Sequence, residues 1–133
     1  MPKFGEKSKQ RLETCHNDIQ KVFNEVIKHV DCTIIEGHRT IVRQQELYNT
    51  ILPDGTRPTN IDGVTTLGNH NYKPSKAVDV LPWPIEIHGV SAWHDRERLC
   101  LFAGFVLGIA RMKGIVLVSG IDWNRDFSTK DTG

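Results

Sequence analysis

The strongest constraint on the fold is a helical repeat of apolar residues near the start of the chain. Between residues 8 and 30, apolar side chains recur at steps of three and four, while lysine, asparagine and glutamate occupy the opposite face. The apolar positions are Leu12, Cys15, Ile19, Val22, Phe23, Val26, Ile27 and Val30. This spacing predicts one amphipathic helix. Because 133 residues suffice for a single domain with one core, we expect this helix to cover that core.

The segments after this helix alternate between extended and helical patterns. Residues 32–37, CTIIEG, are a β-branched run that ends in glycine and predict a strand. Residues 40–51 predict a helix, with Thr40 as its N-cap and Pro53 closing it. Residues 52–71 contain turn signals without periodicity, so we expect a long loop of a kind that often carries function.

The second half of the chain adds more extended segments and one long helix. Residues 76–82, KAVDVLP, predict a strand, and the prolines of residues 82–87 confine that stretch to a sheet edge or a turn. Residues 91–114 predict a largely buried helix with Ser91 as its N-cap, and residues 115–118, IVLV, predict a last strand. This order predicts an α+β fold, in which a small antiparallel sheet packs against about three helices.

Composition limits the classes of partner. Seventeen basic and sixteen acidic side chains give a formal charge of +1, so a local site rather than an overall field must select the partner. Cys15, Cys32 and Cys100 are odd in number and far apart, which indicates neither a disulfide framework nor a cysteine-rich zinc site. The N-terminus lacks an apolar signal segment, and no window approaches the roughly 18 apolar residues of a membrane helix. We expect a monomer made in the cytoplasm without a signal peptide, with no nucleic acid partner and no membrane insertion.

The carboxylate of Asp79 lies in an apolar segment, where burying a charge costs free energy. Asp79 is inside the apolar run AVDVL, and a buried carboxylate needs a cationic partner. The residue types leave two interpretations open. In the first, Arg39 or loop amides satisfy Asp79, and His70 is a solvated loop residue. In the second, His70 and Asp79 share a metal, because histidine and carboxylate on separate segments are what catalytic zinc sites use.

Four segments of the chain follow one family pattern. The most specific is HNYKPSKAVDVLPWPI, which matches His-Asn-x-x-Pro-Ser-x-Ala-Val-Asp-Val-x-Pro. IIEGHRTIVRQQELY is similar to a Glu-Gly-x-Arg-[Ser/Thr] segment with its following Gln, FGEKSKQRLETCHNDI to a Phe-Gly, Ser and Leu pattern, and GIDWNRD to a Gly-Gly-Asp-Trp stretch. Over nearly its whole length the chain thus resembles the zinc peptidases that include D-alanyl-D-alanine carboxypeptidases and phage endolysins cutting the L-alanyl-D-glutamate bond of peptidoglycan.

The resemblance implies a metal centre with an adjacent cation. His70 and Asp79 would be two of three protein ligands of a zinc ion. Arg39 would be the catalytic cation that holds the substrate carbonyl or stabilises the developing oxyanion. The residues themselves also allow a simpler role, in which Arg39 only neutralises Glu36 or Asp79.

The same resemblance implies a substrate cleft. Gln44 would help to line it, Ser75 would lie near the polar groups of the substrate, and Asp122 and Trp123 would shape its far wall. Each of these residues has a simpler structural interpretation: a solvated helix residue for Gln44, a turn residue for Ser75 and a core residue for Trp123.

The resemblance also implies a third ligand and a general base. Relatives continue past the Asp-Trp stretch to an acidic residue followed closely by Pro-His. We therefore expect residues 1–133 to be a single peptidase domain lacking the C-terminal segment with the third metal ligand, and we place that ligand and the base beyond Gly133. His38, His88 and His94 are the internal rivals for the third position.

The implied function is zinc-dependent hydrolysis of a bond in the peptidoglycan stem peptide, L-Ala-D-Glu, by an endolysin that acts at the bacterial cell wall. A D-Ala-D-Ala carboxypeptidase is one alternative. A non-catalytic peptidoglycan-binding module on the same fold is another, and a small regulatory protein unrelated to cell walls is a third.

Overall fold

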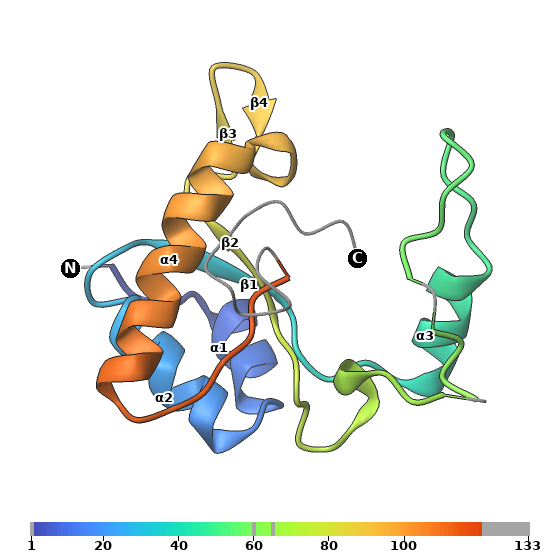
Figure 1. Cartoon of the computed structure of the whole chain (residues 1–133), viewed down its shortest axis with the longest axis horizontal. Coiled ribbons are helices and arrows are strands. Elements are labelled where there is room, and N and C mark those ends of the chain that lie inside the picture. Colours follow the sequence, from blue (N-terminus) through green and yellow to red (C-terminus); the bar gives the residue numbers. More distant parts are fainter. Residues whose placement is uncertain (1, 60, 65, 121–133) are drawn as a thin grey trace.

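Helices surround a short antiparallel strand pair in the computed structural model of the chain, which describes residues 2–59, 61–64 and 66–120 (Figure 1). The elements in chain order are α1 (Glu6–Glu13), α2 (Asn17–Val26), β1 (Cys32–Glu36), α3 (Ile41–Tyr48), the 3-10 turn η1 (Asn69–Asn71), β2 (Asp79–Pro82), β3 (Glu86–Ile87), β4 (Val90–Ser91), the 3-10 turn η2 (Ala92–His94) and α4 (Arg96–Met112). The α+β fold class with a small antiparallel sheet is confirmed.

The prediction of one helix over residues 8–30 is wrong, because two helices share that segment. α1 ends at Glu13, and the His16 Nδ1 accepts a hydrogen bond from the Asp18 N–H at 3.0 Å to cap α2. Between them the backbone pairs with Ser75, whose N–H donates to the Thr14 carbonyl at 2.8 Å and whose carbonyl accepts from the His16 N–H at 2.8 Å. The apolar repeat persists through the break because both helices face the same core.

The sheet register sets the later site. β1 and β2 are antiparallel, with Ile34 opposite Val80 and Glu36 opposite Asp79, and the register shifts between Ile34 and Glu36. The predicted strands at residues 32–37 and 76–82 are therefore present in shortened form. Their pairing brings two carboxylates, one from each strand, to the same end of the sheet.

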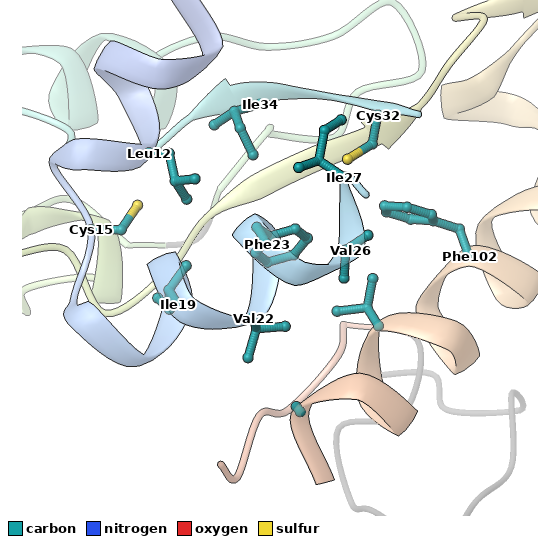
Figure 2. Packing of buried hydrophobic residues seen from close by; sticks show 12 residues of the cluster. Leu12, Cys15, Ile19, Val22, Phe23, Val26, Ile27, Cys32, Ile34 and Phe102 are labelled. Carbon is teal, nitrogen blue, oxygen red and sulfur yellow. The ribbon is translucent and has the colours of Figure 1, made fainter. Parts of the chain in front are cut away.

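The core is apolar and lies between the first two helices, β1 and α4. Figure 2 shows Phe23, Val26 and Ile34 among its buried side chains, with Phe102 approaching from α4. Fully burying such a side chain stabilises the fold by about 1.5–3 kcal/mol relative to leaving it exposed. This cluster, with α1, α2, β1, β2 and α4 around it, is called the body below.

Helix α4 begins later and is more exposed than the sequence predicted. Ser91 caps η2, while α4 starts after Asp95, whose Oδ1 accepts from the Arg98 N–H at 3.2 Å. Only one face of α4 is buried, because Leu101 is 78% exposed and Met112 is 86% exposed, so the expectation of a largely buried helix is wrong. The helix ends before Gly114, at a positive φ of 71°, as predicted.

The predicted strand at residues 115–118 is absent, since residues 115–119 carry no strand assignment. Ile115 and Leu117 nonetheless pack against the core cluster. An apolar run forms a strand only where a neighbouring strand accepts its backbone hydrogen bonds. Within the described ranges, every helix is too short or too polar to cross a lipid bilayer.

α3 and the loop after it stand apart from the body (Figure 1). Thr40 caps α3 as predicted, with its Oγ1 accepting from the Arg43 N–H at 3.1 Å, and the helix ends at Tyr48, ahead of Pro53. Residues 41–67 are called the α3 lobe. Among the residues of this lobe that the structure describes, only Gln44 and Gly63 are buried.

Candidate metal centre

Four side chains converge where the strand pair ends and the chain leaves for the α3 lobe. Glu36 is the last residue of β1, Asp79 is the first residue of β2, His70 lies in η1, and Arg39 follows β1 by three positions. Glu36, His70 and Asp79 each offer a ligand atom, and these atoms all lie within 4.8 Å of one another. The structure thus brings together the three residues that the sequence placed at the centre of the site, and it adds Glu36.

The imidazole of His70 is held in one orientation. Its Nδ1 lies 2.7 Å from the Gly37 carbonyl oxygen, and because a carbonyl only accepts, Nδ1 must carry the proton. The neutral ring then presents the lone pair of Nε2 toward Asp79, whose Oδ1 is 3.5 Å away. A backbone carbonyl that fixes the tautomer in this way is typical of metal-binding histidines.

Gly37 has no room for a side chain. A Cβ at this position would meet the Arg11 carbonyl and the Thr14 hydroxyl, with the Cys15 sulfur at 2.9 Å. The close approach of β1 to the end of α1 therefore requires glycine. It also places the carbonyl that orients His70.

The separation of the two predicted ligands fits a small divalent ion. Two donors that each lie about 2.0–2.2 Å from a tetrahedral zinc are roughly 3.3–3.6 Å apart. The 3.5 Å between His70 Nε2 and Asp79 Oδ1 falls in that range. The donor set of imidazole and carboxylate is also one that zinc accepts.

The net charge of the cluster also favours the binding of a cation. Glu36 and Asp79 supply two negative charges and Arg39 one positive charge, so with a neutral His70 the cluster carries one uncompensated negative charge. Burial alone would lower the pKa of His70. The hydrogen bonds to Asp79 and Gly37 and the charge of Asp79 outweigh burial and the opposing charge of Arg39, so the pKa is raised. The site therefore favours an added cation, whether a proton or a metal.

Each of the three guanidinium nitrogens of Arg39 contacts a neighbouring side chain. Nε donates to Glu36, Nη1 donates to the Gln44 Oε1 at 2.9 Å, and Nη2 lies 3.5 Å from the Asp79 Oδ2. Its side chain is only 11% exposed. The role as counter-ion of both Glu36 and Asp79, which the sequence left open, is present. A guanidinium has five N–H groups, so these contacts do not exhaust its donors.

The backbone ties Arg39 to the segment that carries His70. The Arg39 N–H donates to the His70 carbonyl at 2.7 Å. The Asn71 side-chain amide donates to the Arg39 carbonyl at 2.9 Å. This pair of contacts, called the η1 latch below, joins two segments that are 31 positions apart in the sequence, 70 against 39.

Two predicted cleft residues lie behind the site surface. Gln44 is 1% exposed and bonded at both ends of its amide. Ser75 is fully buried, and its hydroxyl donates to the Ala77 carbonyl at 2.6 Å, which shapes the turn before Asp79. The other two predicted cleft residues, Asp122 and Trp123, lie outside the described residues.

The sequence did not place Glu36 among the ligands, and it named other histidines as rivals. Among the residues that the structure describes, His38, His88 and His94 belong to no group of three potential ligands, whereas Glu36 does. The sequence signals for Glu36 were its place at the end of a β-branched strand and in the Glu-Gly-x-Arg segment, and neither identified it as a potential ligand. Its contact with Asp79 depends on the shifted register of β1 and β2.

A groove of about 750 Å³ opens beside the cluster. Its polar lining includes Arg39, His70 and Asp79, and Lys76 contributes a further cation, whereas Gln44, at 1% exposure, adds almost no surface to it. Its remaining walls are mainly apolar and come from β2, α4 and residues 116–118. The groove is large enough for several residues of an extended peptide, and the ligand cluster forms part of its lining.

The fold and this cluster define an α+β protein with a candidate metal centre at the end of its strand pair. A family model described as phage L-alanyl-D-glutamate peptidase matches residues 1–133, and the chain belongs to that family. The predicted resemblance is confirmed, and so is the class of enzyme, a peptidase that acts on peptidoglycan.

A solved structure supports the same assignment. The L-Ala D-Glu endopeptidase ChiX of Serratia marcescens superimposes with a TM-score of 0.65 at 25% sequence identity, over 95% of this chain and 84% of that chain. No curated protein matches this chain.

Proposed function

We propose that the chain is a zinc-dependent endopeptidase that cleaves the L-Ala-D-Glu bond of the peptidoglycan stem peptide at the bacterial cell wall. The observation that carries the proposal is the pairing of His70 Nε2 with Asp79 Oδ1 at 3.5 Å, with the opposite ring nitrogen tied to Gly37. That arrangement leaves a lone pair and a carboxylate oxygen directed at a position that one ion could occupy. The printed activities of the family and of ChiX support the bond and the substrate.

His70 and Asp79 would hold the zinc ion. When bound, zinc lowers the pKa of its water toward neutrality and supplies a nucleophile. Glu36 is the third potential ligand in the same cluster. Its carboxylate also contacts the Arg39 guanidinium, which ties the position of Glu36 to the rest of the cluster.

Arg39 would stabilise the negative charge that develops on the carbonyl oxygen of the substrate. Its guanidinium is fixed by three neighbours and retains N–H groups that can face the groove. A preorganised donor in a partly buried site needs little reorganisation during the reaction. Ser75 would act from behind, by holding the turn that delivers Asp79 to β2.

The proposal is tested by zinc analysis and by hydrolysis of a stem peptide that contains the L-Ala-D-Glu bond, with fragments identified by mass spectrometry. We expect a chelator to abolish cleavage and added zinc to restore it. His70→Ala and Asp79→Ala should lose both zinc and cleavage while helix content stays unchanged. Normal zinc content in His70→Ala would contradict the assignment of the ligand.

The same assay separates the alternatives. A D-Ala-D-Ala carboxypeptidase would release only the terminal residue of the peptide. A non-catalytic module would bind peptidoglycan and leave the peptide intact. Glu36→Gln with reduced zinc affinity would identify Glu36 as a ligand, whereas unchanged affinity would assign the third position to another residue.

A further inference from the structure

Gln44 is a buried amide that connects the α3 lobe to the site. Its Oε1 accepts from Arg39 Nη1 at 2.9 Å, and its Nε2 donates to the Thr59 hydroxyl at 3.1 Å and to the Ile61 carbonyl at 2.7 Å. Both N–H groups of the amide are therefore used within the protein. With a side chain that is 1% exposed, Gln44 has no donor left for a substrate.

The backbone of the long loop closes around this side chain. A Cβ on Gly63 would lie 2.9 Å from the Gln44 Cγ, and Gly63 has a positive φ of 80°. A Cβ on Gly68 would lie 3.8 Å from the Gln44 Oε1. The loop is therefore shaped to enclose Gln44, and the enclosed amide reaches the guanidinium of the site.

We infer that Gln44 is a positioning residue, which couples Thr59 and Ile61 of the loop to Arg39 and fixes the direction of the guanidinium without touching the substrate. The inference rests on the proposed function for its effect on turnover. Arg39 Nε donates to Glu36 at one side of the guanidinium, whereas Asp79 attracts Nη2 by charge, which is weakly directional. The Gln44 carbonyl adds a directed acceptor to Nη1 and leaves the net charge of the cluster unchanged.

Gln44→Met is the direct test, since methionine keeps the length and apolar volume of the side chain but cannot accept from Arg39 or donate to the loop. Gln45→Met is the matched control, because it makes the same change at the next position of α3. We expect Gln44→Met to lower kcat on the stem peptide by on the order of 10- to 100-fold, the loss typical of a misplaced catalytic group. KM and zinc content should stay within about twofold, as should every parameter of Gln45→Met.

Thr59→Val tests the other end of the connection. Valine keeps the branched shape of Thr59 but removes the hydroxyl that accepts from Gln44 Nε2. We expect a loss of kcat in the same direction as for Gln44→Met but smaller, by roughly two- to tenfold, because the Ile61 carbonyl still accepts from the amide. A kcat equal to that of the unmodified chain in Thr59→Val would limit the coupling to Gln44 and Arg39 alone and overturn the role given to the loop.

Two readouts separate positioning from a general loss of structure. If Gln44 acts through Arg39, Gln44→Met should lower kcat by less than about threefold in an Arg39→Lys background. In NMR spectra, the Nη–H signals of Arg39 should be resolved in the unmodified chain and should merge in Gln44→Met, because the guanidinium rotates more freely.

The outcomes distinguish this inference from the proposed function. Unchanged Arg39 signals in Gln44→Met, or a loss of kcat of the same size with and without Arg39, would overturn the positioning role even in an active zinc enzyme. Absence of zinc and of cleavage in the unmodified chain would instead overturn the proposed function. The Arg39 signals would still test the connection in that case.

Discussion

The body and the α3 lobe are stabilised in different ways, and the site lies where they meet. The body encloses an apolar cluster in which Val22, Val26 and Ile34 are completely buried. In the described part of the lobe, the one buried side chain beyond glycine is the polar Gln44. A small change of volume is costly in a close-packed apolar core, whereas a lobe held by a few hydrogen bonds can open locally. The candidate metal ligands come from elements attached to the body, and the lobe contributes Gln44, which orients Arg39.

The largest expected effect is a core substitution in the body. Ile34→Ala should lower the free energy of unfolding by about 2–5 kcal/mol, because it leaves a cavity in β1 beneath the helices. Ile51→Ala, the same change at an exposed position of the lobe, should stay within about 0.5 kcal/mol. Urea unfolding followed by circular dichroism measures both. Equal losses would show that the lobe contributes an apolar core of its own.

Next in size is a change at the junction. Arg39→Lys keeps the positive charge but loses the planar fork that contacts Glu36, Gln44 and Asp79 together. We expect turnover to fall by on the order of 10- to 1,000-fold with little loss of folding stability. Steady-state kinetics and a melting curve on the same sample check this. Near-normal turnover would mean that Arg39 is only a structural counter-ion.

A smaller effect is expected inside the lobe. Gly63→Ala adds a Cβ that would approach the Gln44 Cγ to 2.9 Å at a φ of 80°, so we expect a local cost of about 1–3 kcal/mol. Gly55→Ala is the matched control, because its φ of 83° is similar while nothing lies within 4 Å of the added atom. Amide hydrogen exchange should accelerate in the lobe of Gly63→Ala, and more than in Gly55→Ala. An equal increase in amide exchange throughout the body would show that the lobe does not open independently of the body.

The smallest expected effect concerns thiol reactivity in the body. Burial, with a contribution from the charge of Asp31, raises the pKa of Cys32 to about 12, and burial also raises the pKa of Cys15. At neutral pH both sulfurs are then protonated, and only thiolates are nucleophilic. A short iodoacetamide pulse, read by mass spectrometry, should label the half-buried Cys100 first. Gly63→Ala should not speed the labelling of Cys32, and if it did, the lobe and the body would open together.

The sequence predicted the elements whose signals are local. The Thr40 cap of α3, the β-branched run of β1 and the glycine after α4 each depend on a few neighbouring residues, and each was found. His70, Asp79 and Arg39 were brought together by a motif resemblance, which carries contact information that periodicity lacks.

The elements that depend on distant contacts were missed. The break after Glu13 exists because Ser75 pairs with that backbone, and a period of 3.6 cannot distinguish one helix from two that share a core. The place of Glu36 beside Asp79 depends on a register shift. The burial of Gln44 depends on loop glycines that fold over it, although an isolated glutamine in a polar segment usually predicts exposure.

The η1 latch has a consequence for how this scaffold can be modified. Because His70 and Arg39 are bound to each other through their own backbones, the spacing between them does not depend on the length of the chain that runs between them. Doubling the length of a flexible loop adds only about 0.6 kcal/mol of closure entropy. The turn around Gly55, away from Thr59 and Ile61, is therefore a place where residues can be inserted, so that the same catalytic spacing can be combined with loops that contact different cell-wall surfaces.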